Sequence, residues 1–341
     1  MTTTELKKYL KKIWKQENGT FALPKVAPLL VGAPGIGKTS IVTQVAEELG
    51  IQCFIELLSM SDPTDASGLP ANVNGKATFL PFDTFQEILT TDKPTIVFFD
   101  DIGQAPTLVQ GAFMNWMTGK VGNKIVPKNI RFIGATNAKA HKAGVQGMLE
   151  PFKSRFSVII TIEPCPVDLA EHFMQIGMPT TLIAFIRLNP AYLVQKEFTM
   201  DIKNSHNSRT IEALGWQEII DIDPSLEAEI FKGCCGEAFA SDYIQFKNLQ
   251  TKIPDPLTVL MNPDTAPIPD NLGAQTLVLT TLARIAKPEQ VGAVITYAKR
   301  FREGKYPAEL ETMCIKFLAQ KKKNAETHAY ADWLTENHKY Q

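Results

Sequence analysis

Short apolar runs alternate with longer amphipathic segments through the first half of the chain. The apolar runs cover residues 27–31, 52–57, 95–99, 130–135 and 158–162. Runs of this length predict buried strands, and the amphipathic segments between them predict helices that pack on a largely parallel sheet. We therefore predict an α/β core over residues 1–165.

The N-terminal residues follow the spacing of one helical face. Leu6, Leu10 and Ile13 lie on that face, and lysines cover the opposite side. A basic amphipathic helix can bind a membrane or nucleic acid, but a helix that packs on its own domain with a solvated lysine face is commoner. We predict the second arrangement.

Helical spacing replaces the strand pattern after residue 165. Amphipathic segments lie at residues 168–176, 181–188, 209–221 and 226–246. They predict a helical lid over residues 166–250. Five prolines crowd residues 251–270 and predict an extended connector, after which helices continue to the end of a third region at 251–341.

The composition excludes several classes of protein. Of the 341 residues 44% are apolar and 21% charged, which excludes a disordered or fibrous chain, and the formal net charge of −1 favours neither nucleic acid nor an acidic membrane. No apolar run approaches the ~20 residues of a membrane span, and the lysine-rich N-terminus has no apolar secretory core. The five cysteines include no CxxC pair, which argues against a disulfide framework or a zinc site. We expect a cytoplasmic protein without a membrane span.

A glycine-rich motif follows the first predicted strand of the core. Residues 32–39 read GAPGIGKT and match the phosphate-binding pattern G-x-x-x-x-G-K-[ST] between a strand and a helix. In this pattern backbone N–H groups surround the phosphates of ATP, Lys38 reaches the β and γ oxygens, and Thr39 ligates Mg²⁺. The residues predicted to contact the nucleotide are Gly32, Ala33, Pro34, Gly35, Ile36, Gly37, Lys38, Thr39 and Ser40.

Polar residues end the next two strands of the predicted core. Asp100 and Asp101 follow the run at 95–99, at the edge where parallel sheets bind ligands. Beside a phosphate-binding loop they form a Walker B pattern, in which Asp100 holds Mg²⁺ and Asp101 activates the attacking water. A helix N-cap explains Asp101 equally well. Asn137 ends the following strand and is either a sensor of the γ-phosphate or a residue that closes a turn.

These motifs occur in the order and spacing of AAA+ ATPases. Besides GAPGIGKT and FFDD, the chain has FIGATN at 132–137, PFKSRF at 151–156 and NSRT at 207–210. Over residues 25–250 the chain specifically resembles the MoxR-like branch. Residues 61–70, SDPTDASGLP, are similar to the segment before a hairpin inserted in helix 2 of that branch, and residues 117–127 are similar to its second hairpin.

The resemblance implies a homo-oligomeric ring, usually a hexamer, with ATP bound between subunits. Arg155 would then be the arginine finger that reaches the neighbour's γ-phosphate, and Arg209 the sensor 2 residue of the lid, completing a catalytic set with Lys38, Asp101 and Asn137. An arginine finger contributes ~10³ to 10⁵ in rate. The family usually has Glu where this chain has Asp101, and misplacing a catalytic group by ~1 Å costs about 10² in rate. We therefore expect slow hydrolysis, which Asp101→Glu leaves unchanged or raises.

The resemblance implies an ATPase that remodels or assembles a protein partner, which in this branch is often a von Willebrand factor A domain protein. Two alternatives stay open. Lys120 and Lys124 on the second hairpin suit a nucleic-acid backbone, as in a translocating or loading motor, although a solvated hairpin tip explains them as well. Asp101 suits an ATP-gated scaffold that hydrolyses slowly.

Overall fold

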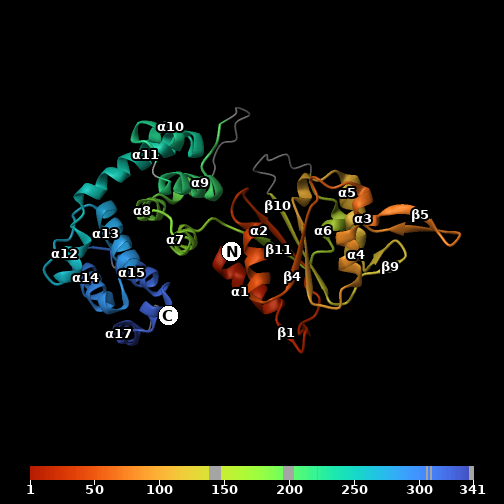
Figure 1. Cartoon of the computed structure of the whole chain (residues 1–341), viewed down its shortest axis with the longest axis horizontal. Helices are drawn as coiled ribbons and strands as arrows, with labels where there is room; N and C mark the ends of the chain where they lie inside the picture. The colour runs from red at the N-terminus through yellow and green to blue at the C-terminus, as the bar shows by residue number, and fades with distance from the viewer. Residues whose placement is uncertain (138–146, 195–202, 221, 305, 308, 338–341) are drawn as a thin grey trace. The chain divides into compact units, whose positions relative to one another are not determined.

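Two compact units make up the chain. The computed structural model describes residues 1–137, 147–194, 203–220, 222–304, 306–307 and 309–337. Unit 1 is Met1–Pro164 and unit 2 is Cys165–Gln341. Figure 1 shows strands and helices together in unit 1 and helices throughout unit 2.

Unit 1 is built on a parallel sheet of five strands. The strands are β3 (Pro28–Gly32), β4 (Gln52–Leu57), β7 (Thr95–Asp100), β10 (Ile130–Asn137) and β11 (Val158–Thr161). Their order is β11-β3-β10-β7-β4, with every neighbouring pair parallel. The five apolar runs of the sequence form these strands, which confirms the predicted fold class. Because β3, β10 and β7 are adjacent, their carboxyl ends meet at one edge of the sheet.

Helices and short antiparallel ladders complete unit 1. The helices are α1 (Thr3–Ile13), α2 (Lys38–Glu48), α3 (Pro63–Ser67), α4 (Asp83–Thr90), η1 (Ile102–Gln104), α5 (Thr107–Met117) and α6 (Glu150–Lys153). The ladders pair β1 (Gln16–Glu17) with β2 (Thr20–Phe21), β5 (Leu69–Val73) with β6 (Lys76–Leu80), and β8 (Lys120–Val121) with β9 (Lys124–Ile125).

The two faces of the sheet carry separate parts of the core. Along β7, Ile96 and Phe98 pack in a cluster with side chains of α1 and α2, whereas Val97 and Phe99 pack with those of α4 and α5. This alternation follows from the two-residue period of a strand. Helix α1 packs on α2 as predicted, with its apolar face buried in the first cluster. The strand β7 is therefore fixed from both sides, which holds the carboxylates at its end.

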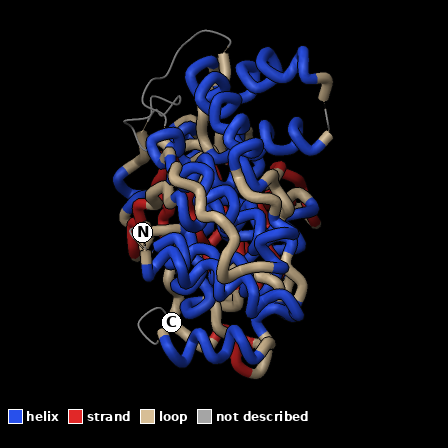
Figure 2. The backbone as a smooth tube through the Cα atoms, turned by 90° about the vertical axis from the view of Figure 1, so that its left-hand side faces the viewer, coloured by secondary structure: helices blue, strands red, loops and turns tan. Residues whose placement is uncertain are grey.

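Unit 2 consists of helices and connecting loops in its described residues. They are α7 (Pro166–Gln175), α8 (Thr180–Leu188), η3 (Pro190–Leu193), α9 (Ser208–Ile219), α10 (Pro224–Cys235), α11 (Glu237–Lys247), η4 (Asn248–Lys252), α12 (Pro256–Met261), α13 (Leu272–Ile285), η5 (Pro288–Gln290), α14 (Val291–Glu303), α15 (Glu309–Ala319), α16 (Lys322–Ala325) and α17 (His328–Glu336). Figure 2 marks the helices of both units in blue. Among the described residues, no helix combines the length and the apolar character needed to cross a bilayer.

Two helical predictions for unit 2 change in detail. The segment predicted over 226–246 is split into α10 and α11, since Gly236 has a φ of 86°, which ends a right-handed helix. The proline-rich segment holds the short helix α12 where an extended connector was predicted. Pro256 occupies its first turn, where a missing N–H costs nothing, and the Asp255 side chain caps the helix by accepting from Thr258 N at 2.9 Å.

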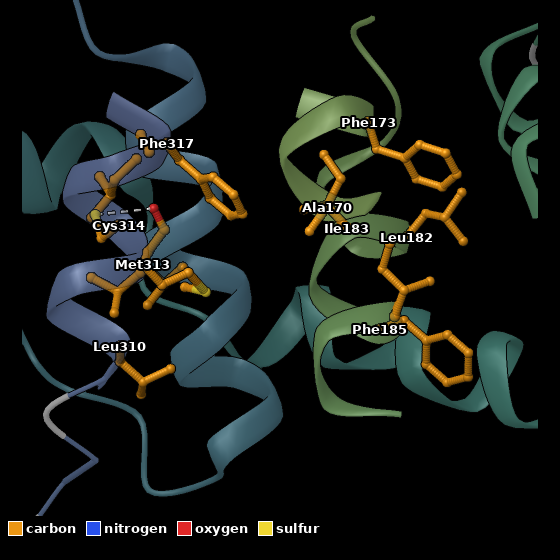
Figure 3. Close-up of a cluster of buried hydrophobic side chains, with 14 of the residues drawn as sticks. Ala170, Phe173, Leu182, Ile183, Phe185, Leu310, Met313, Cys314 and Phe317 are labelled. Atoms are coloured by element: carbon orange, nitrogen blue, oxygen red, sulfur yellow. Dashed lines mark hydrogen bonds between the residues drawn. The ribbon is translucent and has the colours of Figure 1, made fainter. Parts of the chain in front are cut away.

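One hydrophobic core joins the helices before and after the proline-rich segment. It includes side chains of α7 and α8 and side chains of α15 (Figure 3). Helix α13 packs on both α8 and α15, and Cys314 Sγ donates a weak bond to Leu279 O at 3.5 Å. The C-terminal helices therefore fold with the helices that precede the connector.

Candidate functional site

The glycine-rich loop joins the end of β3 to the start of α2. Its turn needs left-handed backbone at Gly35 and Gly37, with φ of 75° and 93°, which residues with a Cβ rarely adopt. No side chain caps the N-terminus of the 11-residue α2. Its first N–H groups and its dipole are therefore available to an anion at the loop, as a phosphate requires.

Lys38 is buried at the edge of the sheet, with 7% of its surface exposed. Its Nζ donates to the backbone oxygens of Gly32 and Ala33, at 3.1 and 3.0 Å, and to Asn137 Oδ1 at 2.8 Å. The carboxyl ends of β3 and β10 thus bring together two residues that are 99 positions apart. The buried ammonium group is stabilised by hydrogen bonds to uncharged oxygens, and phosphate oxygens could take the place of these acceptors.

Thr39 and Asp100 form a second polar pair beside Lys38. Thr39 Oγ1 donates to Asp100 Oδ2 at 2.5 Å, and Asp100 Oδ1 accepts from Asp101 N at 2.9 Å. Asp100 is 6% exposed. A hydroxyl and a carboxylate make an all-oxygen donor set with few protein ligands, which fits Mg²⁺, an ion that keeps several waters and binds substrate phosphates. The residues predicted to hold the metal therefore lie together.

Asp101 follows β7 in a left-handed conformation, with φ 53° and ψ 35°. Asp adopts this region more readily than most residues with a Cβ. Its side chain makes no capping hydrogen bond to the 3-10 turn η1, which removes the N-cap interpretation. Instead Asp101 Oδ1 accepts from Gln104 Nε2 at 3.1 Å. The second carboxylate is therefore held by a side chain three residues further along the chain.

The turn after Asp101 is also attached to the end of β10. Gly103 N donates to Thr136 Oγ1 at 3.2 Å. This bond places η1 beside the strand that ends in Asn137. The turn after β7 and the end of β10 are thus linked by a bond from backbone to side chain, in addition to the pairing of the two strands in the sheet.

The segment that carries Arg155 is anchored in the core of unit 1. Phe152 and Phe156 are buried, and the ring of Phe152 lies 6.3 Å from that of Phe99 on β7. Gly134 on β10 allows Phe156 to pack against the sheet, since a Cβ at Gly134 would lie 2.6 Å from the Phe156 ring. Arg155 N donates to Phe152 O at 3.1 Å, and its exposed side chain makes no hydrogen bond or ion pair with another described residue. The structure therefore leaves its guanidinium available for a partner.

The buried Gln110 joins α5 to the segment before α6. It is fully buried, its Nε2 donates to Ala105 O and Gly147 O at 3.0 and 2.9 Å, and its Oε1 accepts from Leu149 N at 2.9 Å. Sequence reasoning missed Gln110, Gln104 and Thr136. The one signal was a glutamine inside the apolar stretch TLVQGAF, where a polar residue on a buried face indicates a bonded amide.

Arg209 belongs to unit 2, in the first turn of α9, and is exposed. The Asn207 side chain caps that helix by accepting from Arg209 N at 3.0 Å and Thr210 N at 3.2 Å. The contact of Arg209 with a phosphate in unit 1 stays a prediction.

Two hairpins lie side by side in unit 1. The β5–β6 hairpin turns at Asn74 and Gly75, both with positive φ, as in a tight two-residue turn. The β8–β9 hairpin contacts it, because Asn123 Nδ2 donates to Thr78 Oγ1 at 3.2 Å. Lys120 is exposed, whereas Lys124 donates to Gln86 Oε1 of α4. Of the two predicted nucleic-acid contacts, Lys124 thus has a partner within the unit.

Part of unit 1 matches a known protein family. Residues 28–164 match the model of the family described as "ATPase family associated with various cellular activities (AAA)". The matched residues have the P-loop fold of AAA ATPases. Gly32, Lys38, Thr39, Asp100 and Asn137 all lie within the match. Unit 2 lies outside the matched residues.

Similar solved structures include mutants of RuvB from Thermotoga maritima. A lysine-to-arginine mutant is 16% identical over 70% of this chain and 69% of that chain, with a TM-score of 0.37. A proline-to-glycine mutant is 14% identical over 98% of this chain and 86% of that chain, with a TM-score of 0.36. Scores this low assign no function. No curated protein matches the chain.

Proposed function

We propose that the chain is an AAA+ ATPase of the MoxR-like branch that binds ATP with Mg²⁺ and hydrolyses it in a ring of identical subunits. The observation that carries the proposal is the pairing of Lys38 with Asn137 and of Thr39 with Asp100. These bonds join three separate motifs of the sequence at one sheet edge. The match of residues 28–164 to the AAA family supports the same activity.

The side chains at this edge suit phosphoryl transfer to water. On binding ATP, Lys38 would exchange its bond to Asn137 for phosphate oxygens, which frees the Asn137 amide for the γ-phosphate or the water. Asp101 would take the proton of the attacking water. Mg²⁺ would neutralise charge on the phosphates, and Thr39 and Asp100 are the residues that would hold it.

The exposed Arg155 supports an active site that two subunits share. An arginine finger must reach the active site of the neighbouring subunit from the surface of its own. Arg155 is exposed, and it lies in a segment whose two phenylalanines, Phe152 and Phe156, are buried in the core. Arg209 of α9 would contact phosphate from the lid. A hexamer is the ring size that the resemblance implies.

Steady-state hydrolysis against protein concentration tests this arrangement. We expect the rate per subunit to rise cooperatively with concentration and to stay flat, ~10³-fold lower, in Arg155→Ala. Lys153→Ala removes a cation two residues earlier, at the last residue of α6, and is the matched control that should keep the cooperative rise. Equal hydrolysis rates for the wild-type chain and for Arg155→Ala would contradict the role of Arg155 as an arginine finger. ATP binding without measurable hydrolysis at every protein concentration would favour the ATP-gated scaffold instead.

Exposed apolar side chains on the hairpins favour a protein as the substrate to be remodelled. Ile125 is 72% exposed, Leu69 52% and Leu80 51%. An apolar surface of this kind fits a protein partner better than the charged backbone of a nucleic acid. In the MoxR-like branch the partner is often a von Willebrand factor A domain protein, which is the partner class we propose.

A nucleic-acid motor is the second candidate function, because Lys120 is exposed on the β8–β9 hairpin. Measuring hydrolysis with and without DNA separates the two. We expect no stimulation for the proposed protein-remodelling function. Stimulation that disappears in Lys120→Ala would establish the nucleic-acid motor instead.

A further inference from the structure

The nitrogen and the oxygen of the Gln104 side-chain amide differ in their hydrogen bonding. Its Nε2 donates to Asp101 Oδ1 at 3.1 Å, whereas its Oε1 is buried without a hydrogen-bond partner among the described residues. Reversing the amide would place its oxygen against the carboxylate oxygen, so that two acceptors would meet. The contact with Asp101 therefore determines the orientation of the amide.

The backbone around Gln104 fixes where its side chain lies. Gln104 N donates to Asp101 O at 3.0 Å, which closes the turn, and the bond from Gly103 N to Thr136 holds the turn at the sheet edge. The left-handed backbone of Asp101 starts this turn. Backbone and side chain of Gln104 thus both return to Asp101.

A buried acceptor without a partner lowers stability, and an apolar side chain of the same size avoids that cost. Stability alone therefore favours leucine at this position. The amide gains its one side-chain bond from the carboxylate that we propose as the general base. This points to a role in hydrolysis rather than in folding.

We propose that Gln104 is a positioning residue for hydrolysis: its Nε2 holds the Asp101 carboxylate in one orientation at the sheet edge. The proposal rests on the proposed function, since it assigns Asp101 the role of base. Gln104 itself transfers no proton. Its bond to a charged group fixes a short side chain that would otherwise rotate about two torsions.

The test compares the full-length chain with Gln104→Leu. We expect kcat to fall about tenfold to a hundredfold with KM for ATP unchanged, because the bond orients the base and does not touch the nucleotide. The Tm should stay equal or rise.

Two further variants control the comparison. Gln16→Leu removes an amide that donates to Leu49 O at 3.0 Å far from the site, and should leave kcat and KM unchanged. Gln104→Glu keeps the shape but supplies no donor when ionised, so it should be slower than Gln104→Leu.

Asp101→Asn separates the two proposals. If Asp101→Asn hydrolyses ATP at the wild-type rate, the role of Asp101 in the proposed function fails. If Asp101→Asn is inactive while Gln104→Leu keeps the wild-type kcat, only the role of Gln104 is overturned. A lower Tm in Gln104→Leu with kcat and KM for ATP unchanged would make Gln104 a structural residue and also overturn it.

A double-mutant cycle in thermal unfolding gives a readout independent of hydrolysis. We expect Gln104→Leu to raise Tm more in the Asp101→Ala chain than in the wild-type chain, because alanine has already removed the acceptor of the Gln104 amide and no bond is lost to offset the gain. Equal Tm changes in both backgrounds would show that the two side chains are not coupled and would overturn the proposal.

Discussion

Buried polar side chains serve different purposes in the two units. At the sheet edge of unit 1, Lys38 and Asn137 bond to each other where a phosphate is expected to bind. In unit 2, Glu311 of α15 is 2% exposed and accepts from Trp333 Nε1 of α17 at 2.7 Å. It also forms an ion pair with Arg302 of α14, whose Nε lies 3.3 Å from Glu311 Oε2. A bound phosphate could replace the bond between Lys38 and Asn137. The contacts of Glu311 instead hold α14, α15 and α17 together within the core of unit 2.

A second network in unit 2 repeats this difference. Tyr243 of α11 is fully buried, and its hydroxyl donates to Glu218 of α9 and lies 3.1 Å from Thr181 Oγ1 of α8. Burial, and then the nearby Glu218 carboxylate, raise the pKa of Tyr243 well above its ordinary value. The phenol therefore stays protonated and donates. Changes at the edge of unit 1 should alter activity, and changes in these networks should alter stability.

Lys38→Ala should have the largest effect on activity. Removing the ammonium group takes away the charge that the phosphates meet, so hydrolysis should fall by about 10²- to 10³-fold. Isothermal titration should show ATP affinity falling too. Unchanged ATP affinity would show that the nucleotide binds elsewhere.

Glu311→Leu should have the largest effect on stability. It leaves Trp333 Nε1 without its acceptor and Arg302 without its carboxylate, which should lower the unfolding free energy by about 2–3 kcal/mol, since Arg302 is partly exposed. Urea unfolding measures the loss, and ATP affinity should not change. Glu311→Gln keeps an acceptor and should lose less. Equal losses for the two variants would contradict the role of the bonds.

Asp101→Glu sharpens the comparison within unit 1. Similarity to the MoxR-like branch alone predicted equal or faster turnover for this change. The left-handed turn favours Asp, and a longer side chain cannot keep the same bond to Gln104, so we now expect about a tenfold fall in kcat with intact ATP binding. Faster turnover would show that the turn adapts to the longer side chain.

Tyr243→Phe should have the smallest effect. It removes one buried hydroxyl, and the unfolding free energy should fall by about 1 kcal/mol with hydrolysis unchanged. Tyr192→Phe is the matched control, because its hydroxyl donates to Asp242 at 2.5 Å at an exposed site and should change stability by less than ~0.5 kcal/mol. A loss of hydrolysis in Tyr243→Phe would contradict a purely structural network.

The sequence predicted the elements whose cause is local. Apolar runs located all five strands of the sheet, and the motifs located Lys38, Thr39, Asp100 and Asn137, which the parallel topology then brings together. The roles of Arg155 and Arg209 came from the resemblance and stay predictions, because each depends on a contact outside its own unit.

The features that the sequence did not predict depend on tertiary packing. Gln104 and Gln110 look like surface residues by composition, since glutamine is mostly exposed. The Gln104 side chain is held in the turn after β7 by its bond to Asp101. Gln110 is buried by its contact with the segment before α6, which lies 37 residues further along the chain. The sequence also did not predict that helices before and after the proline-rich segment share one hydrophobic core. The prolines predict a connector, but they do not indicate which helices pack together on either side of it.

The contacts of Lys38 also bear on how tightly a nucleotide can bind. The Lys38 ammonium group has three oxygen acceptors within the protein, on Gly32, Ala33 and Asn137. A phosphate that binds Lys38 must compete with these oxygens. Part of the binding energy of a nucleotide would therefore replace contacts that already exist.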